Sequence, residues 1–178
     1  MGKLTNIKRG NGYAQGGLVA ILAFPTFLAN GATRSASYTP DATNEKLIST
    51  ITLDATVVPV ILESEIDKAN YTANLTVGAG RYIAQALGFT LAGTDAEKTK
   101  ALEDVDLQLY TYIVKDRRGK YFLLGEENGL IASQNNNGSG SAAGDLNGYE
   151  IIVGGSENGR PREVSEAAYA TLAALVTP

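Results

Sequence analysis

The residues of this chain whose types and spacing could do chemistry are carboxylates in two clusters. Glu63, Glu65 and Asp67 stand at alternate positions, and Glu126 is followed directly by Glu127. Two carboxyl groups at a suitable separation can act as acid and base in glycoside hydrolysis. However, the chain has no Trp, and no aromatic-lined cleft is evident in its sequence. We therefore interpret both clusters as solvated residues of a strand end and a turn.

A second candidate is the motif Asp-x-x-Gly, which occurs at residues 116–119 and 145–148. In GTPases this motif helps to position magnesium, but the phosphate-binding loop that accompanies it there has no counterpart in this sequence. Calcium is an alternative at the second copy, because Asp145, Asn147 and Glu150 offer oxygen ligands, although the EF-hand spacing is missing. An Asp that opens a turn and a Gly that accepts positive φ, followed by an aromatic and apolar run, favour β-hairpin turns.

Two glycine clusters, at 10–17 and 138–144, are superficially similar to dinucleotide-binding fingerprints. The third glycine has the wrong spacing in both, and neither cluster lies between a predicted strand and a helix that it feeds. We interpret both as flexible linkers.

The composition narrows the function classes. The chain has no Cys and no His, so thiolate chemistry, disulfides and the commonest metal ligand and general base are all missing. Its 15 basic and 19 acidic residues give a net charge of −4, without the clustered basic face that specific nucleic-acid binding needs. The sequence predicts a protein that is not an enzyme and has no catalytic, cofactor or metal site.

The 178 residues suit one domain, and 44% apolar residues suffice for a single core. Residues 1–16 are polar and basic and predict an extended N-terminal arm, with a single β-sandwich domain over 17–178. The basic residues of this arm before the apolar run 18–24 imitate a secretory signal, but glycines start that run and Pro25 interrupts it. We expect a soluble, unprocessed chain that does not enter a membrane.

Strand periodicity with β-branched residues and glycine-bounded turns predict a mainly β fold, an antiparallel β-sandwich or barrel. Pro59 cannot donate to a ladder, so the strand around it is expected at an edge or a bulge. Residues 29–44 and 154–159 are expected as a loop and a turn, and residues 81–92 are ambiguous. The predicted strands are 18–24, 47–53, 57–62, 71–77, 107–114, 120–124, one beginning at 130–133, 149–153 and 161–164.

One short flanking α-helix is predicted over 95–104, with Thr94 as N-cap and Glu97 as its capping-box partner. A C-terminal helix over 165–176, capped by Ser165, is also expected, with a strand as the alternative. The segment 134–144 is rich in Asn, Gly and Ser and predicts a flexible loop that projects from the body.

The segment 109–164 resembles structural proteins of tailed bacteriophages, especially tail tube proteins of phages that infect Bacteroidetes-type hosts. A Gly-Asn-Gly near the start, with Gly16-Gly17-Leu18, fits the same resemblance, which covers about half of the chain. The residues that carry it are Tyr112-Ile113-Val114-Lys115-Asp116, Gly119-Lys120-Tyr121, Leu124-Gly125, Gly138-Ser139-Gly140, Asp145-Leu146-Asn147-Gly148-Tyr149 and Arg162-Glu163-Val164.

This resemblance implies a virion structural protein, located in the phage tail and assembled in the host cytoplasm. Subunits would join edge to edge into hexameric rings, and the rings would stack into a tube that conducts DNA without binding it specifically. Other virion proteins would be its partners. A capsid decoration or head-to-tail joining protein is the first alternative, and a ligand- or carbohydrate-binding β-sandwich module is the second.

Overall fold

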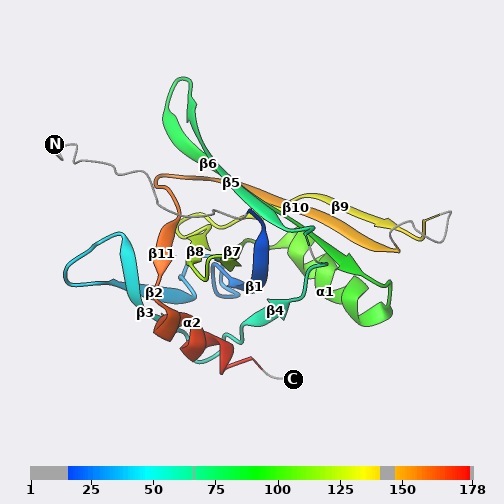
Figure 1. Ribbon diagram of the computed structural model, residues 1–178, viewed down its shortest axis with the longest axis horizontal. Helices are drawn as coiled ribbons and strands as arrows, with labels where there is room; N and C mark the ends of the chain where they lie inside the picture. Colours follow the sequence, from blue (N-terminus) through cyan, green and yellow to red (C-terminus); the bar gives the residue numbers. More distant parts are fainter. Residues whose placement is uncertain (1–15, 66, 141–146, 177–178) are drawn as a thin grey trace.

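The computed structural model describes residues 16–65, 67–140 and 147–176 (Figure 1). These residues form two β-sheets and two α-helices, which confirms the mainly β fold with one flanking and one C-terminal helix. Within the described residues, neither sheet closes into a barrel, so the arrangement is that of a sandwich. The predicted arm at 1–16 lies almost wholly outside the described residues.

The larger sheet has seven strands in the order β2-β3-β11-β8-β7-β1-β4. All neighbours are antiparallel except β3 and β11, which run parallel. The strand β4 begins directly after Pro59 and ends the sheet, which confirms the predicted edge position. The strands are β1 (Leu18–Pro25), β2 (Ala36–Pro40), β3 (Leu47–Leu53), β4 (Val60–Leu62), β7 (Tyr110–Asp116), β8 (Tyr121–Leu124) and β11 (Arg162–Val164).

The smaller sheet has four antiparallel strands in the order β5-β6-β10-β9. The ambiguous segment 81–92 forms its longest strand, β6. The strands are β5 (Asn70–Val77), β6 (Arg81–Ala92), β9 (Ile131–Gly138) and β10 (Gly148–Glu157).

The core has two parts, one on each face of the seven-stranded sheet. Between the two sheets lie alternate residues of the strands that face each other, such as Ile21, Tyr112, Leu87 and Ile151. The opposite face of the seven-stranded sheet packs against α2 (Glu166–Ala173). Since both faces of β1 are covered, its apolar residues 21–24 are all buried, and the strand reads as a continuous apolar run.

The helix α2 begins as predicted, because the Ser165 hydroxyl accepts a hydrogen bond from the backbone N–H of Ala168 at 3.2 Å. The helix α1 (Ala96–Leu107) starts one residue later than predicted and continues to Leu107. Its N-cap is Asp95 rather than Thr94, and the Asp95 carboxylate accepts the backbone N–H of Lys98 at 2.8 Å. Thr94 is engaged elsewhere, since its hydroxyl donates to the side-chain oxygens of Asn137 and Asn147.

Three loop predictions are corrected by the structure. Residues 29–44 contain β2, and residues 154–157 continue β10 instead of forming a turn. The proposed flexible loop 134–144 begins as strand, because residues 134–138 belong to β9 and pair with β10. This pairing satisfies the backbone of the Asn-rich run, which its polar side chains alone would not predict. Residues 141–144 lie outside the described residues.

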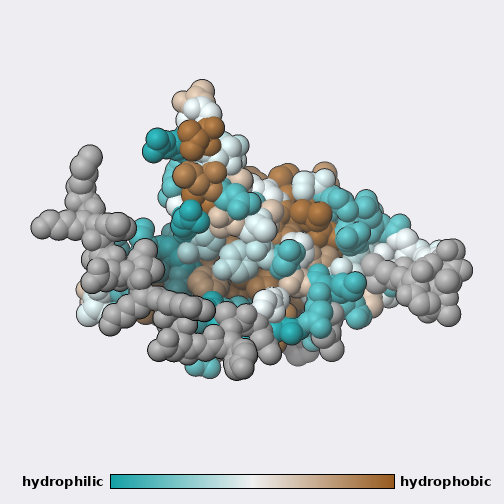
Figure 2. All heavy atoms as spheres, turned by 45° about the horizontal axis from the view of Figure 1, so that its top comes forward, coloured by the Kyte–Doolittle hydropathy of each residue, from teal (hydrophilic) through white to brown (hydrophobic). Residues whose placement is uncertain are grey.

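The hairpin formed by β5 and β6 projects beyond the body of the sandwich (Figure 1). Hydrophobic residues are visible on this projection in the space-filling view (Figure 2). The strand β5 of this hairpin carries Leu75 and Val77, which are 55% and 61% exposed. An apolar, solvent-exposed projection is unusual for a monomer and marks a surface that can be covered by a partner.

Candidate functional site

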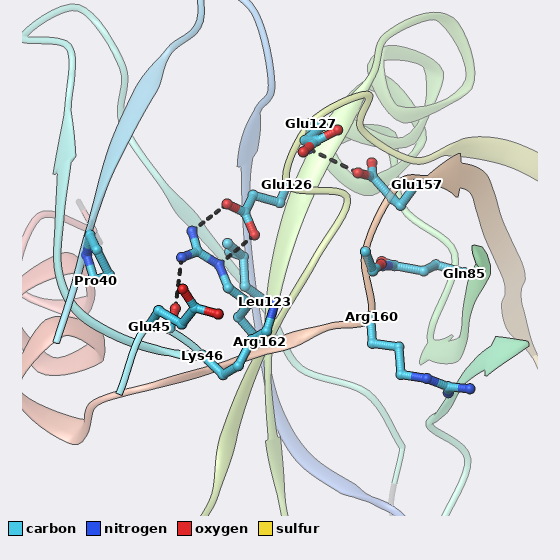
Figure 3. Close-up of a pocket in the computed structure, with 11 residues that line it drawn as sticks. Pro40, Glu45, Lys46, Gln85, Leu123, Glu126, Glu127, Glu157, Arg160 and Arg162 are labelled. Atoms are coloured by element: carbon cyan, nitrogen blue, oxygen red, sulfur yellow. Dashed lines mark hydrogen bonds and ion pairs between the residues drawn. The ribbon is translucent and has the colours of Figure 1, made fainter. Parts of the chain in front are cut away.

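The polar candidate site is a pocket of about 420 Å³ that opens where the loops after β8 and β10 meet β11 (Figure 3). The loop after β8 contributes Glu126 and Glu127, and β10 ends in Glu157. The pocket therefore contains the second of the two predicted carboxylate clusters, together with the buried carboxylate of Glu157, which no sequence motif had indicated. Its remaining lining residues are Pro40, Glu45, Lys46, Gln85, Leu123, Gly159, Arg160 and Arg162.

Glu157 is the buried carboxylate of this pocket, with only 2% of its surface exposed. Its two oxygens accept the backbone N–H groups of Glu127 at 3.0 Å and Asn128 at 2.9 Å. Burial raises the pKa of Glu157 above its ordinary value, although these N–H groups favour the charged form and act in the opposite direction. Its carboxylate thus holds the loop between β8 and β9 against the end of β10.

Gln85 makes a second link across the same region from β6. Its side-chain oxygen accepts the backbone N–H of Gly125 at 3.0 Å, and its side-chain NH₂ donates to the backbone carbonyl of Gly159 at 3.0 Å. One buried amide therefore ties together the loops that follow β8 and β10. Such an amide is satisfied on both sides, which is what allows a polar group to be buried.

Arg162 forms the charged wall of the pocket. Its guanidinium makes two hydrogen bonds to the Glu126 carboxylate, one of them from Nε to Oε2 at 2.8 Å, and Nη1 donates to the backbone carbonyl of Glu45 at 3.3 Å. This is the bidentate geometry that gives an Arg–carboxylate pair its strength and direction. The neighbouring Glu127 carboxylate accepts a hydrogen bond from Asn158. The carboxylates of Glu126, Glu127 and Glu157 are thus used as acceptors within the protein, and the arrangement stabilises three loops.

The first predicted carboxylate cluster lies elsewhere, between β4 and β5. Asp67 forms an ion pair with Arg117, and the backbone N–H of Glu65 donates to the carbonyl of Thr90 at 2.8 Å. Glu63 and Glu65 border a different cavity from the one that contains Glu126 and Glu127. The structure therefore does not bring the two clusters into one site.

The first Asp-x-x-Gly motif forms the turn that joins β7 to β8, as predicted. The Asp116 carboxylate accepts the backbone N–H groups of Arg118 at 2.9 Å and Lys120 at 2.8 Å, and Gly119 has φ of 81°. Burial alone would raise the pKa of Asp116, but these hydrogen bonds and the Arg118 guanidinium together hold it below its ordinary value.

The second copy of the motif cannot be compared fully, because Asp145 lies outside the described residues. Of its proposed calcium ligands, Asn147 accepts a hydrogen bond from Thr94, and Glu150 is an exposed residue of β10. Over residues 16–65, 67–140 and 147–176, no group of three or more Asp and Glu residues is arranged to hold a metal ion. In the same part of the chain, no helix is long and apolar enough to cross a membrane.

An apolar groove of about 810 Å³ lies between the edge strand β4 and the helix α1. Its floor includes Leu62, Leu91, Leu102 and Val105, and Val60 and Ile61 of β4 border it as exposed residues. Sequence reasoning missed this groove, because its walls come from segments about 30 to 50 residues apart. The exposed apolar side chains of β4 were the only local signal that could have indicated it.

No protein-family model matches the chain, and no curated protein or solved structure is significantly similar to it.

Proposed function

We propose that this chain is a virion structural protein, most specifically a phage tail tube subunit that forms stacked hexameric rings. The observation that carries the proposal is the projecting β5–β6 hairpin with its exposed Leu75 and Val77. Burying an apolar side chain of this size contributes about 1.5–3 kcal/mol, so a partner surface that covers the hairpin gains substantial binding energy.

The ends of the two sheets also support assembly. Among the residues that the structure describes both sheets are open, with β2 and β4 at the ends of the larger sheet and β5 and β9 at the ends of the smaller one. A strand at a sheet edge has backbone N–H and C=O groups free to pair with another strand. Ring closure removes such edges by pairing them with edges of neighbouring subunits.

The outer face of the four-stranded sheet suits a surface that DNA passes without binding. Most residues on this face are uncharged, as in the cross-strand row of Asn70, Gly88, Ile152 and Gln134. Among the side chains of these four strands that point to this face, Glu150 alone is charged. A face without Lys or Arg offers DNA phosphates no ion pair, and a ring of Glu150 carboxylates repels them weakly.

The decisive experiment is the assembly state of the purified full chain. We expect sixfold rings or tubes by negative-stain electron microscopy and a concentration-dependent increase in mass by sedimentation velocity. A strictly monomeric species at high protein concentration would overturn the proposal. Threefold or twelvefold particles would instead assign the chain to the capsid decoration or head-to-tail joining class.

A further inference from the structure

The apolar side chains of the β5–β6 hairpin belong to the face that forms the core farther along the same strands. In the β5–β6 register, Leu75 is opposite Ile83 and Tyr71 is opposite Leu87. Leu87 is fully buried between the sheets, whereas Leu75 and Val77 have no described residue covering most of their surface. The hairpin therefore extends an internal, core-forming face beyond the end of its own sandwich.

The groove between β4 and α1 is a surface of matching character. It is mainly apolar, and among residues 16–65, 67–140 and 147–176 β4 has a strand neighbour on one side only, which leaves its other edge available for pairing with another strand. An extended segment that enters the groove can place apolar side chains in it and add its backbone to this edge.

The hairpin cannot reach the groove of its own chain. One end of β6, at Leu91 and Ala92, lines the groove. The other end, at Arg81, lies at the tip of the hairpin. A strand rises about 3.3 Å per residue, so the eleven steps between residues 81 and 92 separate the two ends by roughly 36 Å. Any contact between tip and groove is therefore made by two different molecules.

The charges of the two surfaces are complementary. Arg81 is the one charged residue between Asn70 and Ala92, and it forms no ion pair within the described part of the chain. The groove is bordered by four carboxylates and one ammonium group, that of Lys98, which already pairs with Asp95. The carboxylates belong to Glu63, Glu65, Glu97 and Asp104.

We propose that the β5–β6 hairpin of one copy docks in the groove between β4 and α1 of a second copy. Leu75 and Val77 fill the apolar floor, and Arg81 lies near the carboxylates at its border. This inference rests on the proposed function, since it names the surfaces through which the subunits assemble. The contact joins two different patches, so repeated contacts generate a closed ring or a continuing stack.

The test uses the absence of cysteine from the sequence. Full-length chains carrying Val77→Cys are mixed with full-length chains carrying Val60→Cys and treated with a short bis-maleimide cross-linker. We expect a cross-linked pair that contains one chain of each kind, identified by mass spectrometry, and little cross-linking of either variant alone.

Three outcomes would overturn the docking proposal. If rings or tubes form by microscopy without the mixed cross-link, subunits assemble through other surfaces and the proposed function stands. If Val60→Cys is linked instead to an Ile7→Cys chain, the N-terminal segment occupies the groove. If no assembly forms at all, the proposed function fails together with its interface.

A charge substitution gives an independent measurement. Val77→Asp places a carboxylate in an acidic, apolar groove, so we expect the protein concentration needed for assembly to rise at least about tenfold. Leu175→Asp is the matched control, because Leu175 is 50% exposed beyond α2, on the other side of the seven-stranded sheet. An equal effect of both substitutions would contradict the specific role of the hairpin.

Discussion

At the scale of single residues, two buried tyrosines of the same core differ in one hydrogen bond. The Tyr149 hydroxyl lies 2.6 Å from that of Thr99, whereas the Tyr112 hydroxyl has no hydrogen-bond partner in the described part of the chain. Burial raises the pKa of Tyr112 well above its ordinary value, so this phenol stays neutral. A buried hydroxyl without a partner costs free energy, while a paired one does not.

This difference predicts opposite effects of the same substitution. Tyr112→Phe removes an unpaired hydroxyl and is expected to raise the free energy of unfolding by about 1 kcal/mol, whereas Tyr149→Phe is expected to lower it by about 1 kcal/mol. Urea denaturation of the two variants and the parent chain measures both changes. A loss of stability in Tyr112→Phe equal to that in Tyr149→Phe would show that the Tyr112 hydroxyl is paired.

Several residue roles could be predicted from the sequence because they act on their immediate neighbours. Asp116 bonds to N–H groups two and four residues away, and Ser165 bonds to the N–H three residues away. Gln85 and Glu157 could not be identified in this way, because the partners of Gln85 lie 40 and 74 positions away and those of Glu157 lie 30 and 29 positions away. Their roles depend on which loops the two sheets bring together.

At the scale of elements, the loop between β8 and β9 is held by a titrating group. Glu157 has a raised pKa in the folded protein, so the folded state binds its proton more readily than the unfolded state. Its contribution to stability is fully present below the ordinary value of 4.5 and is lost as pH rises through the raised pKa.

Glu157→Gln removes this titration and provides the test. We expect the stability of the parent chain relative to this variant to increase as pH falls from 7.5 to 5, measured by urea denaturation at each pH. Asp54→Asn serves as the control, since hydrogen bonds from Thr56 lower the pKa of the exposed Asp54 and its contribution is lost only at lower pH. If the difference in free energy of unfolding between the parent chain and Glu157→Gln stayed constant from pH 7.5 to 5, the expectation would be contradicted.

The elements that the sequence predicted are those with a regular pattern. The strands β3 and β5 alternate clearly, and β1 is a short apolar run with glycine and proline at its ends. The strand β6 stayed ambiguous because Gln85 interrupts its buried row while alanines occupy its outer row. The strand β2 was missed, and the continuation of β9 over residues 134–138 was predicted as a loop, because polar residues at sheet edges carry no hydrophobic signal.

At the scale of the whole molecule, the proposed tube gives the two faces of the sandwich different environments. The outer face of the four-stranded sheet, which includes exposed Thr72, would face the lumen, and the β2 edge, which includes exposed Thr39, would lie elsewhere. The fold class was predictable from turns and strand periodicity. The arrangement of faces was not, because it depends on how distant strands pair.

Accessibility of introduced cysteines measures this difference. In assembled protein, Thr72→Cys is expected to react with a small maleimide but much more slowly with a maleimide on a large polymer, which a narrow lumen excludes. Thr39→Cys in the same assemblies is expected to react with both maleimides. Unassembled Thr72→Cys protein is also expected to react with both. Equal polymer labelling of the two variants after assembly would place the four-stranded sheet outside the lumen.

The position of β11 has a consequence for how the chain is made. This strand comes late in the sequence but lies between β3 and β8, so it alone joins the β2–β3 pair to the other strands of the larger sheet. During synthesis, the sheet stays in two parts until residues Arg162–Val164 have left the ribosome. Such long-range pairing slows folding, and it delays a complete subunit until nearly all of the described chain has been translated.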